Sequence, residues 1–216
     1  MALRIMLTFF CYITGQTVNC RVPYQPLPPC DHEEADTRIC IHLQDAMEKG
    51  ARKVFVRTVD TDVIVVIAGI FFELQKSYSG LDVWVAFGMG KNIQYYHMNT
   101  VCQGLGEEKC TGLPFYHSFT GCDTTSQFLG KGKKSSWVAW KAYSSVTRAF
   151  QYAAKNPFQL LDCDSTIFQT LERFTCVLYD KTTPITKVNN LRQDLFSKRA
   201  KLMDNIPPTQ VSSTYN

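Results

Sequence analysis

Carboxylates occur at three points of the chain where a strand is expected to end or a helix to begin. They are Glu34 and Asp36 in HEEAD, Asp60 and Asp62 in DTD, and Asp123 in TGCD. Carboxylates that share a site repel one another unless cations offset their charge. Hard divalent ions such as Mg²⁺ or Mn²⁺ prefer oxygen ligands, and two of them about 4 Å apart can promote hydrolysis of a phosphodiester. The pattern predicts a metal site built from these five residues.

Each acidic stretch also has a simpler interpretation. Glu33 and Glu34 are favoured in a first helical turn by the helix dipole. Asp60 and Asp62 are suitable for a turn and a helix N-cap. Gly-Cys-Asp is a common turn sequence. Without a shared site, these residues would be caps in an α/β interaction module.

A glycine and lysine turn follows Asp123 within a few residues. Its sequence is Gly130-Lys131-Gly132-Lys133-Lys134. Such a turn offers backbone N–H groups and positive charge to a phosphate, whereas a lone carboxylate repels one. A cation must therefore mediate if Asp123 and the turn act together.

The first half of the chain must supply the strands that position the acidic residues. A capping-box pattern at Asp31 and Glu34 predicts a helix that ends near Gly50. The β-branched residues 53–59 predict a strand, the long apolar segment 60–74 favours a helix, and 81–88 predicts a second strand. Residues 92–98, NIQYYHM, are expected to pair with it through the GMGKN turn. The order indicates an α/β sheet with parallel connections, and Asp60 and Asp62 then lie at the carboxyl end of a strand, where ligands collect.

The second half is helical by its pattern. Helices are predicted at 97–105, 113–120, 132–143, 145–154, 165–180 and 188–201. The last is amphipathic and basic, and the residues from Asn205 onward are expected to form a frayed tail.

Composition limits the class of protein. A chain of 216 residues with 45% hydrophobic residues is typical of a globular protein, and its net charge of +4 is too weak to argue for an anionic partner. Nine cysteines without a Cys-x-x-Cys pair favour buried thiols of an intracellular protein. The longest apolar run, 63–72, is about half the ~20 residues of a membrane span, so no membrane helix is expected.

Taken in order, the acidic stretches and the turn resemble the internal region of the flap endonuclease and XPG-like 5′ nucleases of the PIN-like superfamily. The resemblance rests on PPCDHEEADT, on Asp-Thr-Asp after VFVRTV, on Gly-Cys-Asp and on the Gly-x-Gly turn, and it covers roughly residues 20–145. Sequences with HEEADTR, RTVDTDV and TGCDTTS runs also resemble open reading frames of mobile elements in animal genomes.

The resemblance implies a PIN-like parallel sheet flanked by helices, with a helical C-terminal part that holds a helix-turn-helix-like DNA-binding turn. The five carboxylates would bind Mg²⁺ or Mn²⁺, and the glycine and lysine turn would hold the DNA backbone, in an intracellular, nuclear protein with no membrane contact. The family also uses aspartates from a segment that would precede residue 1, so an N-terminally truncated site is expected. A catalytically inactive DNA-binding relative is the alternative. The predicted parts are a strand and linker (1–30), a nuclease-like domain (31–145), a helical extension (146–204) and a tail (205–216).

Two expectations concern residues near the site. Arg57, beside the DTD stretch, has two open interpretations, contact with a phosphate or an ion pair with a carboxylate. Trp84, Trp137 and Trp140 are expected to pack in the core rather than to stack on bases.

Overall fold

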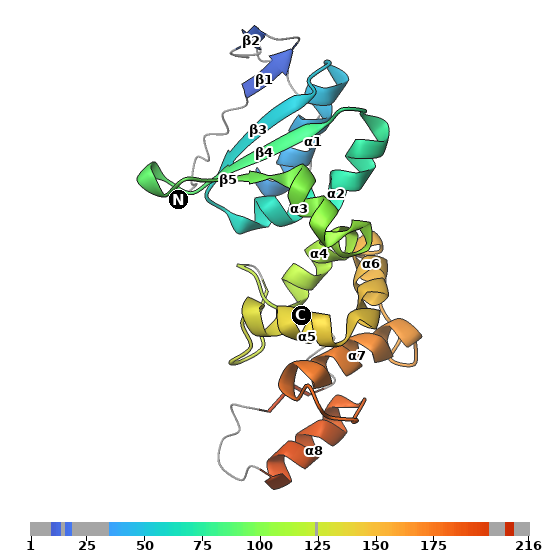
Figure 1. The fold of residues 1–216 in the computed structure, drawn as a ribbon. Coiled ribbons are helices and arrows are strands. Elements are labelled where there is room, and N and C mark those ends of the chain that lie inside the picture. Colours follow the sequence, from blue (N-terminus) through green and yellow to red (C-terminus); the bar gives the residue numbers. More distant parts are fainter. Residues whose placement is uncertain (1–9, 14–15, 19–34, 124, 199–205, 210–216) are drawn as a thin grey trace. The chain divides into compact units, whose positions relative to one another are not determined.

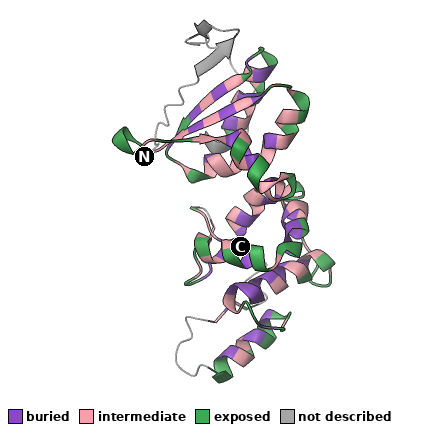
Figure 2. Ribbon diagram, in the orientation of Figure 1, coloured by how far each residue is buried: buried purple, intermediate pink, exposed green. Residues whose placement is uncertain are grey.

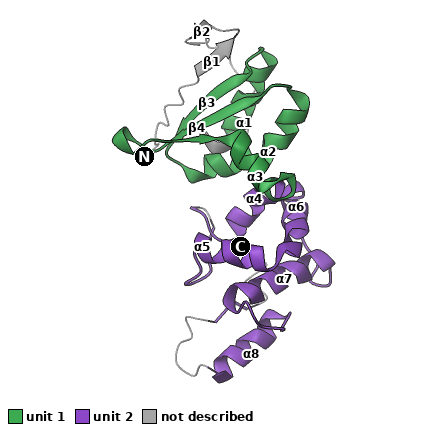
Figure 3. Ribbon diagram, viewed as in Figure 1, with its two compact units in different colours: residues 1–110 green, residues 111–216 purple. Residues whose placement is uncertain are grey.

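The structure is a computed structural model that divides into two compact units, residues 1–110 and residues 111–216 (Figure 3). It describes residues 10–13, 16–18, 35–123, 125–198 and 206–209, with side chains described from Arg38 onward. The boundary predicted near residue 145 lies inside the second unit, and the predicted domain limits stay a prediction. The two units are described separately below.

The first unit contains a mixed sheet with the strand order β2-β1-β3-β4-β5 (Figure 1). Strands β3 and β4 are parallel, whereas β1 pairs with β3 and β5 pairs with β4 in antiparallel orientation. The parallel β3–α2–β4 connection and the β4–β5 hairpin confirm the α/β prediction for this part of the chain. The bounds of the strands are β1 Phe10–Ile13, β2 Gln16–Val18, β3 Lys53–Thr58, β4 Asp82–Phe87 and β5 Gln94–His97.

Three helices accompany this sheet in the described part of the first unit, α1 (Ala35–Glu48), α2 (Thr61–Ser77) and α3 (Met98–Leu105). The long apolar segment after Asp60 is helical, as predicted, because it is too long for a strand and begins with an N-cap residue. A short 3₁₀ turn, Gly90–Asn92, lies in the β4–β5 connection.

The sheet has two different faces because burial alternates along β3 and β4 (Figure 2). The face that carries Val54, Val56, Val83 and Val85 is buried. These valines form the core of the first unit together with apolar residues of the helices, which are Ile39, Leu43, Met47, Val63, Ile67, Phe71, Met98 and Cys102. The opposite face, here called the outer face, carries Lys53, Phe55, Arg57, Asp82, Trp84, Ala86, Tyr95 and His97.

The second unit is helical in its described part, as the sequence pattern predicts. Helix α4 begins in the last residues of the first unit and continues into the second. It begins six residues earlier than expected, at Glu107, just after Gly106 ends α3 with a φ of 83°. Gly112 and Pro114 weaken the helical pattern there. Helix α6 packs closely there and favours a glycine, because a Cβ atom at Gly112 would lie only 3.0 Å from Cβ of Phe150. The bounds are α4 Glu107–Phe119, α5 Lys133–Ala142, α6 Thr147–Lys155, α7 Thr166–Tyr179 and α8 Val188–Lys198.

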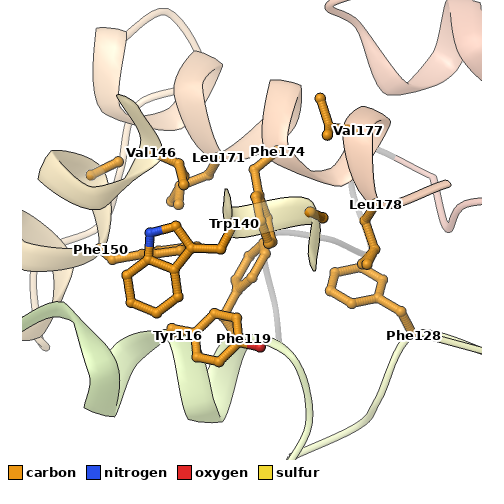
Figure 4. Close-up of a cluster of buried hydrophobic side chains, with 12 residues drawn as sticks. Tyr116, Phe119, Phe128, Trp140, Val146, Phe150, Leu171, Phe174, Val177 and Leu178 are labelled. Atoms are coloured by element: carbon orange, nitrogen blue, oxygen red, sulfur yellow. The ribbon is translucent and has the colours of Figure 1, made fainter. Parts of the chain in front are cut away.

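An aromatic core holds these helices together (Figure 4). Trp140 lies at the centre of this core and is 1% exposed, and its indole N–H donates a hydrogen bond to Oγ1 of Thr147 at 2.9 Å. The expectation that Trp140 is a core residue is therefore confirmed. The other buried members are Tyr116, Phe119, Phe128, Ala139, Val146, Ala149, Phe150, Leu171, Phe174, Val177 and Leu178.

Candidate metal and nucleic-acid site

Asp60 and Asp62 lie directly after the carboxyl end of β3. The backbone N–H of Asp60 donates to Oγ1 of the buried Thr58 at 3.0 Å. Oδ1 of Asp60 then accepts a hydrogen bond from the backbone N–H of Asp62 at 2.9 Å, so that Asp60 is the N-cap of α2. The capping role is thus confirmed for Asp60. Since a carboxylate has a second oxygen with two lone pairs, capping leaves ligand capacity at the same residue.

The other predicted metal ligands are distributed differently. Glu33 and Glu34 lie outside the described residues, and Asp36 is the second residue of α1 with a side chain that is also outside them. Asp123 is exposed and belongs to the second unit. Among the residues with described side chains, no three His, Cys, Asp or Glu groups lie close enough to hold a metal ion. A single site formed by all five carboxylates stays a prediction.

The described residues on either side of Asp123 make specific contacts. Gly121 has a φ of 95°, and a Cβ atom there would lie 2.4 Å from Cβ of Gln127. Thr125 closes the loop, because its hydroxyl donates to the carbonyl of Ser118 at 2.7 Å and accepts from the N–H of Cys122 at 3.1 Å. An open hollow of about 460 Å³ lies over this loop, lined by Gly121, Cys122, Asp123, Thr125, Ser126 and Gln127.

The three lysines of the glycine and lysine turn differ in their surroundings. Nζ of Lys131 lies 4.9 Å from the ring centre of Tyr179, a cation–π geometry. Lys133 turns toward the end of α4, where its ammonium donates to the carbonyl of His117 and, at 2.8 Å, to Oγ1 of Thr120. Lys134 is exposed. Two of the three predicted DNA-binding lysines therefore stabilise contacts within the second unit, and Lys134 has the exposure that a DNA contact needs.

Helix α5 begins directly at this turn. Gly130 adopts a φ of 69°, which glycine tolerates, and Gly132 is the N-cap without a side-chain hydrogen bond to the helix. The first N–H groups of a helix have no acceptor within it. The N-terminus of α5 thus begins at the glycine and lysine turn, and its contact with a phosphate stays a prediction.

Among the described cysteines, Cys102, Cys110 and Cys176 are buried, whereas Cys163 is exposed. Six cysteines have described side chains, and none of these six forms a disulfide. Burial raises the pKa of Cys40 to about 11 and that of Cys176 to about 12. The pKa of Cys110 is lowered because the thiol of Cys102 donates a hydrogen bond to it, but both side chains are fully buried. Burial in these positions agrees with the predicted buried thiols.

The sequence interpretation missed the outer face of the sheet. Trp84 was expected in the core, yet it is only half-buried on this face. Its ring stacks on His97 with a centroid distance of 4.5 Å and on Phe55 with one of 6.1 Å. The outer face could have been found from the strict alternation of valines with aromatic and charged residues along β3 and β4, because alternate residues of a strand point to opposite faces.

A scan against protein-family models found none that matches the chain, and searches of curated proteins and of solved structures found no match either. None of the helices in the described part of the chain is long and apolar enough to cross a membrane.

Proposed function

We propose that this chain is a PIN-like, nuclease-like domain that hydrolyses phosphodiesters of branched or duplex DNA with Mg²⁺ or Mn²⁺. The observation that carries the proposal is the position of Asp60 and Asp62. Both directly follow the carboxyl end of β3, the strand that pairs in parallel with β4. In open α/β sheets, ligands bind beyond these strand ends.

The donor chemistry of this strand end fits a hard divalent cation. The carboxylates of Asp60 and Asp62 would be ligands, with the Asp60 oxygen that does not cap α2 available for the ion. Glu34, Asp36 and Asp123 are the further ligands that the sequence proposes. A bound cation would supply Lewis-acid stabilisation of charge on a phosphate. The protein residues would fix its position and neutralise its charge.

The DNA backbone would be held by the turn at 130–134 and the start of α5. Lys134 is exposed there, and the N-terminal N–H groups of α5 add dipolar attraction for a phosphate. Lys131 and Lys133 would contribute through the positive field of the turn rather than through direct contact. An intracellular, nuclear location and an origin in a mobile element belong to the same proposal.

A second candidate is a relative that binds nucleic acid but does not cleave it. One specific observation favours it. Asp60 already uses one carboxylate oxygen to cap α2, so this residue has a structural role that would keep it in place without catalysis. Such a relative would bind DNA in a salt-dependent manner and leave it intact.

The first experiment measures thermal unfolding in EDTA and in Mn²⁺. A ligand that binds the folded state raises its stability by mass action, so wild type should melt at a higher temperature in Mn²⁺. Asp62→Asn should lose this metal-dependent rise. The matched control is Asp45→Asn, which removes one carboxylate from an exposed helical ion pair with Lys49 and should keep the rise.

The result also separates the candidates. A rise that disappears in Asp62→Asn justifies cleavage assays on branched DNA, where the inactive relative predicts binding without products. Equal melting temperatures in EDTA and Mn²⁺ for wild type would contradict the metal site and leave an α/β interaction module.

A further inference from the structure

The outer face of the sheet is organised in three cross-strand rows. Strand register pairs Lys53 with Asp82 in the first row. The Asp82 carboxylate accepts a hydrogen bond from Nε2 of His97 at 3.0 Å, and its other oxygen lies 3.4 Å from Nζ of Lys53. The second row consists of Phe55, Trp84 and His97, and the third of Arg57, Ala86 and Tyr95.

The second row is an aromatic ladder. The ring planes of Phe55 and Trp84 differ by 18° and those of Trp84 and His97 by 20°, so the three rings stand side by side. The indole Nε1 of Trp84 is buried but has no hydrogen-bond partner among the described residues. Buried donors in proteins are nearly always paired. The row is therefore expected to receive an acceptor from a bound partner.

The third row combines two large exposed groups with a small side chain between them. Tyr95 is 64% exposed and Arg57 is exposed, with Ala86 on the strand between them. No described residue forms a hydrogen bond or ion pair with the Arg57 guanidinium or the Tyr95 hydroxyl. Neighbouring strands lie about 4.8 Å apart, so these two residues are roughly 10 Å apart across β4. A flat ring that stacks between two partners needs about 7–8 Å between those partners. The space between Arg57 and Tyr95 is therefore wide enough for one ring.

We propose that the outer face binds single-stranded nucleic acid, with one base stacked over Ala86 between Arg57 and Tyr95. The charges fit this occupant, because the exposed Arg57 guanidinium has no ion-pair partner among the described residues and offers a cation for a phosphate. Lys53 on the same face is paired with Asp82, which also accepts a hydrogen bond from His97. Aromatic rings and guanidinium groups on an open surface are the usual platform for unpaired bases.

The inference deepens the proposed function and rests on it for the role of the bound strand as a substrate. Arg57 precedes Asp60 by three residues, so at about 3.3 Å per residue the third row lies within roughly 10 Å of the DTD carboxylates along the chain. A single strand on the outer face would thus lead its backbone to the proposed cation site. The substrate class would be DNA with an unpaired segment.

The test measures binding of the full chain to a fluorescein-labelled oligothymidine by anisotropy, in EDTA so that no metal site is needed. Tyr95→Ala and Arg57→Ala should each weaken binding by about ten-fold or more. Tyr95→Phe should bind like wild type because the ring remains. Lys49→Ala removes an exposed cation just after α1, at a residue that pairs with Asp45, and should also bind like wild type apart from a small charge effect.

Trp84 supplies a second, independent signal. Its fluorescence should change when the oligonucleotide binds, and Trp84→Phe should remove that change. Absence of binding by wild type, or equal binding by Tyr95→Ala and wild type, would overturn the proposal and leave the face to a protein partner.

Different results would contradict the outer-face site and the metal site. Binding that is lost in Tyr95→Ala without any metal-dependent stabilisation would support the outer-face site and contradict the metal site. Metal-dependent DNA cleavage that is unchanged in Tyr95→Ala would support the metal site and contradict the outer-face site.

Discussion

Replacement of Lys133 by methionine separates the structural from the DNA-binding role of the glycine and lysine turn. The ammonium of Lys133 donates to the carbonyl of His117 and the hydroxyl of Thr120 at the end of α4. Methionine keeps the length of the side chain but removes both hydrogen bonds and the positive charge. The helix end then loses its cationic partner.

The size of the effect follows from these contacts. A hydrogen bond with a charged group contributes about 1.5–3 kcal/mol, and a cation at a helix C-terminus adds about 0.3–1 kcal/mol. Lys133 is only half-buried, so water replaces part of what is lost. We expect the free energy of unfolding to fall by about 1–3 kcal/mol. In a unit of this size, each kcal/mol lowers the melting temperature by roughly 4–8 °C.

The measurement is thermal unfolding followed by tryptophan fluorescence in a Trp84→Phe background. Trp137 and Trp140, which both belong to the second unit, then report its unfolding. The matched control is Lys134→Met in the same turn, which should change stability by less than about 0.5 kcal/mol. In DNA binding the order should reverse, because Lys134→Met should weaken affinity and reduce the salt dependence by about one counterion.

Unchanged melting of Lys133→Met together with a large loss of DNA affinity would refute the argument. Lys133 would then contact the phosphate backbone in solution, and α4 would end without its ammonium.

Two further predictions concern the second unit. Gly121→Ala should destabilise this unit by about 2–5 kcal/mol in urea unfolding, because a left-handed φ and a 2.4 Å approach to Gln127 both oppose a Cβ atom. The control Gly132→Ala, at a φ of −74° with open space around it, should change the free energy of unfolding by less than about 1 kcal/mol. Equal effects of the two substitutions would contradict the geometry. Burial raises the pKa of Cys176 from 9.0 to about 12, so the folded unit keeps this proton where the unfolded chain loses it, and stability should fall as the pH rises from about 9 to 12. Urea unfolding across this range should show a shallower decline for Cys176→Ala, and an equal slope for wild type and variant would contradict the assignment.

The sequence determined the secondary structure of the best-patterned segments. Alternating β-branched residues predict β3 and β4, and the length of the apolar run after Asp60 predicts α2, because these signals depend on neighbours in the chain. The same reasoning placed the start of α4 too late. Glycine and proline lower helix propensity locally, whereas the contact of Gly112 with Phe150 comes from a residue 38 positions away.

The residue types of the candidate sites were also readable in the sequence, but the direction of their side chains was not. The sequence shows three lysines in one turn, and only the packing of α5 against the end of α4 makes Lys133 a structural residue and leaves Lys134 exposed. It also shows Trp84 as a large aromatic residue suitable for a core. Strand order and the helices on the valine face decide that its ring lies on the outer face. Local sequence fixes the period of an element, whereas the side that is buried depends on contacts between residues far apart in the chain.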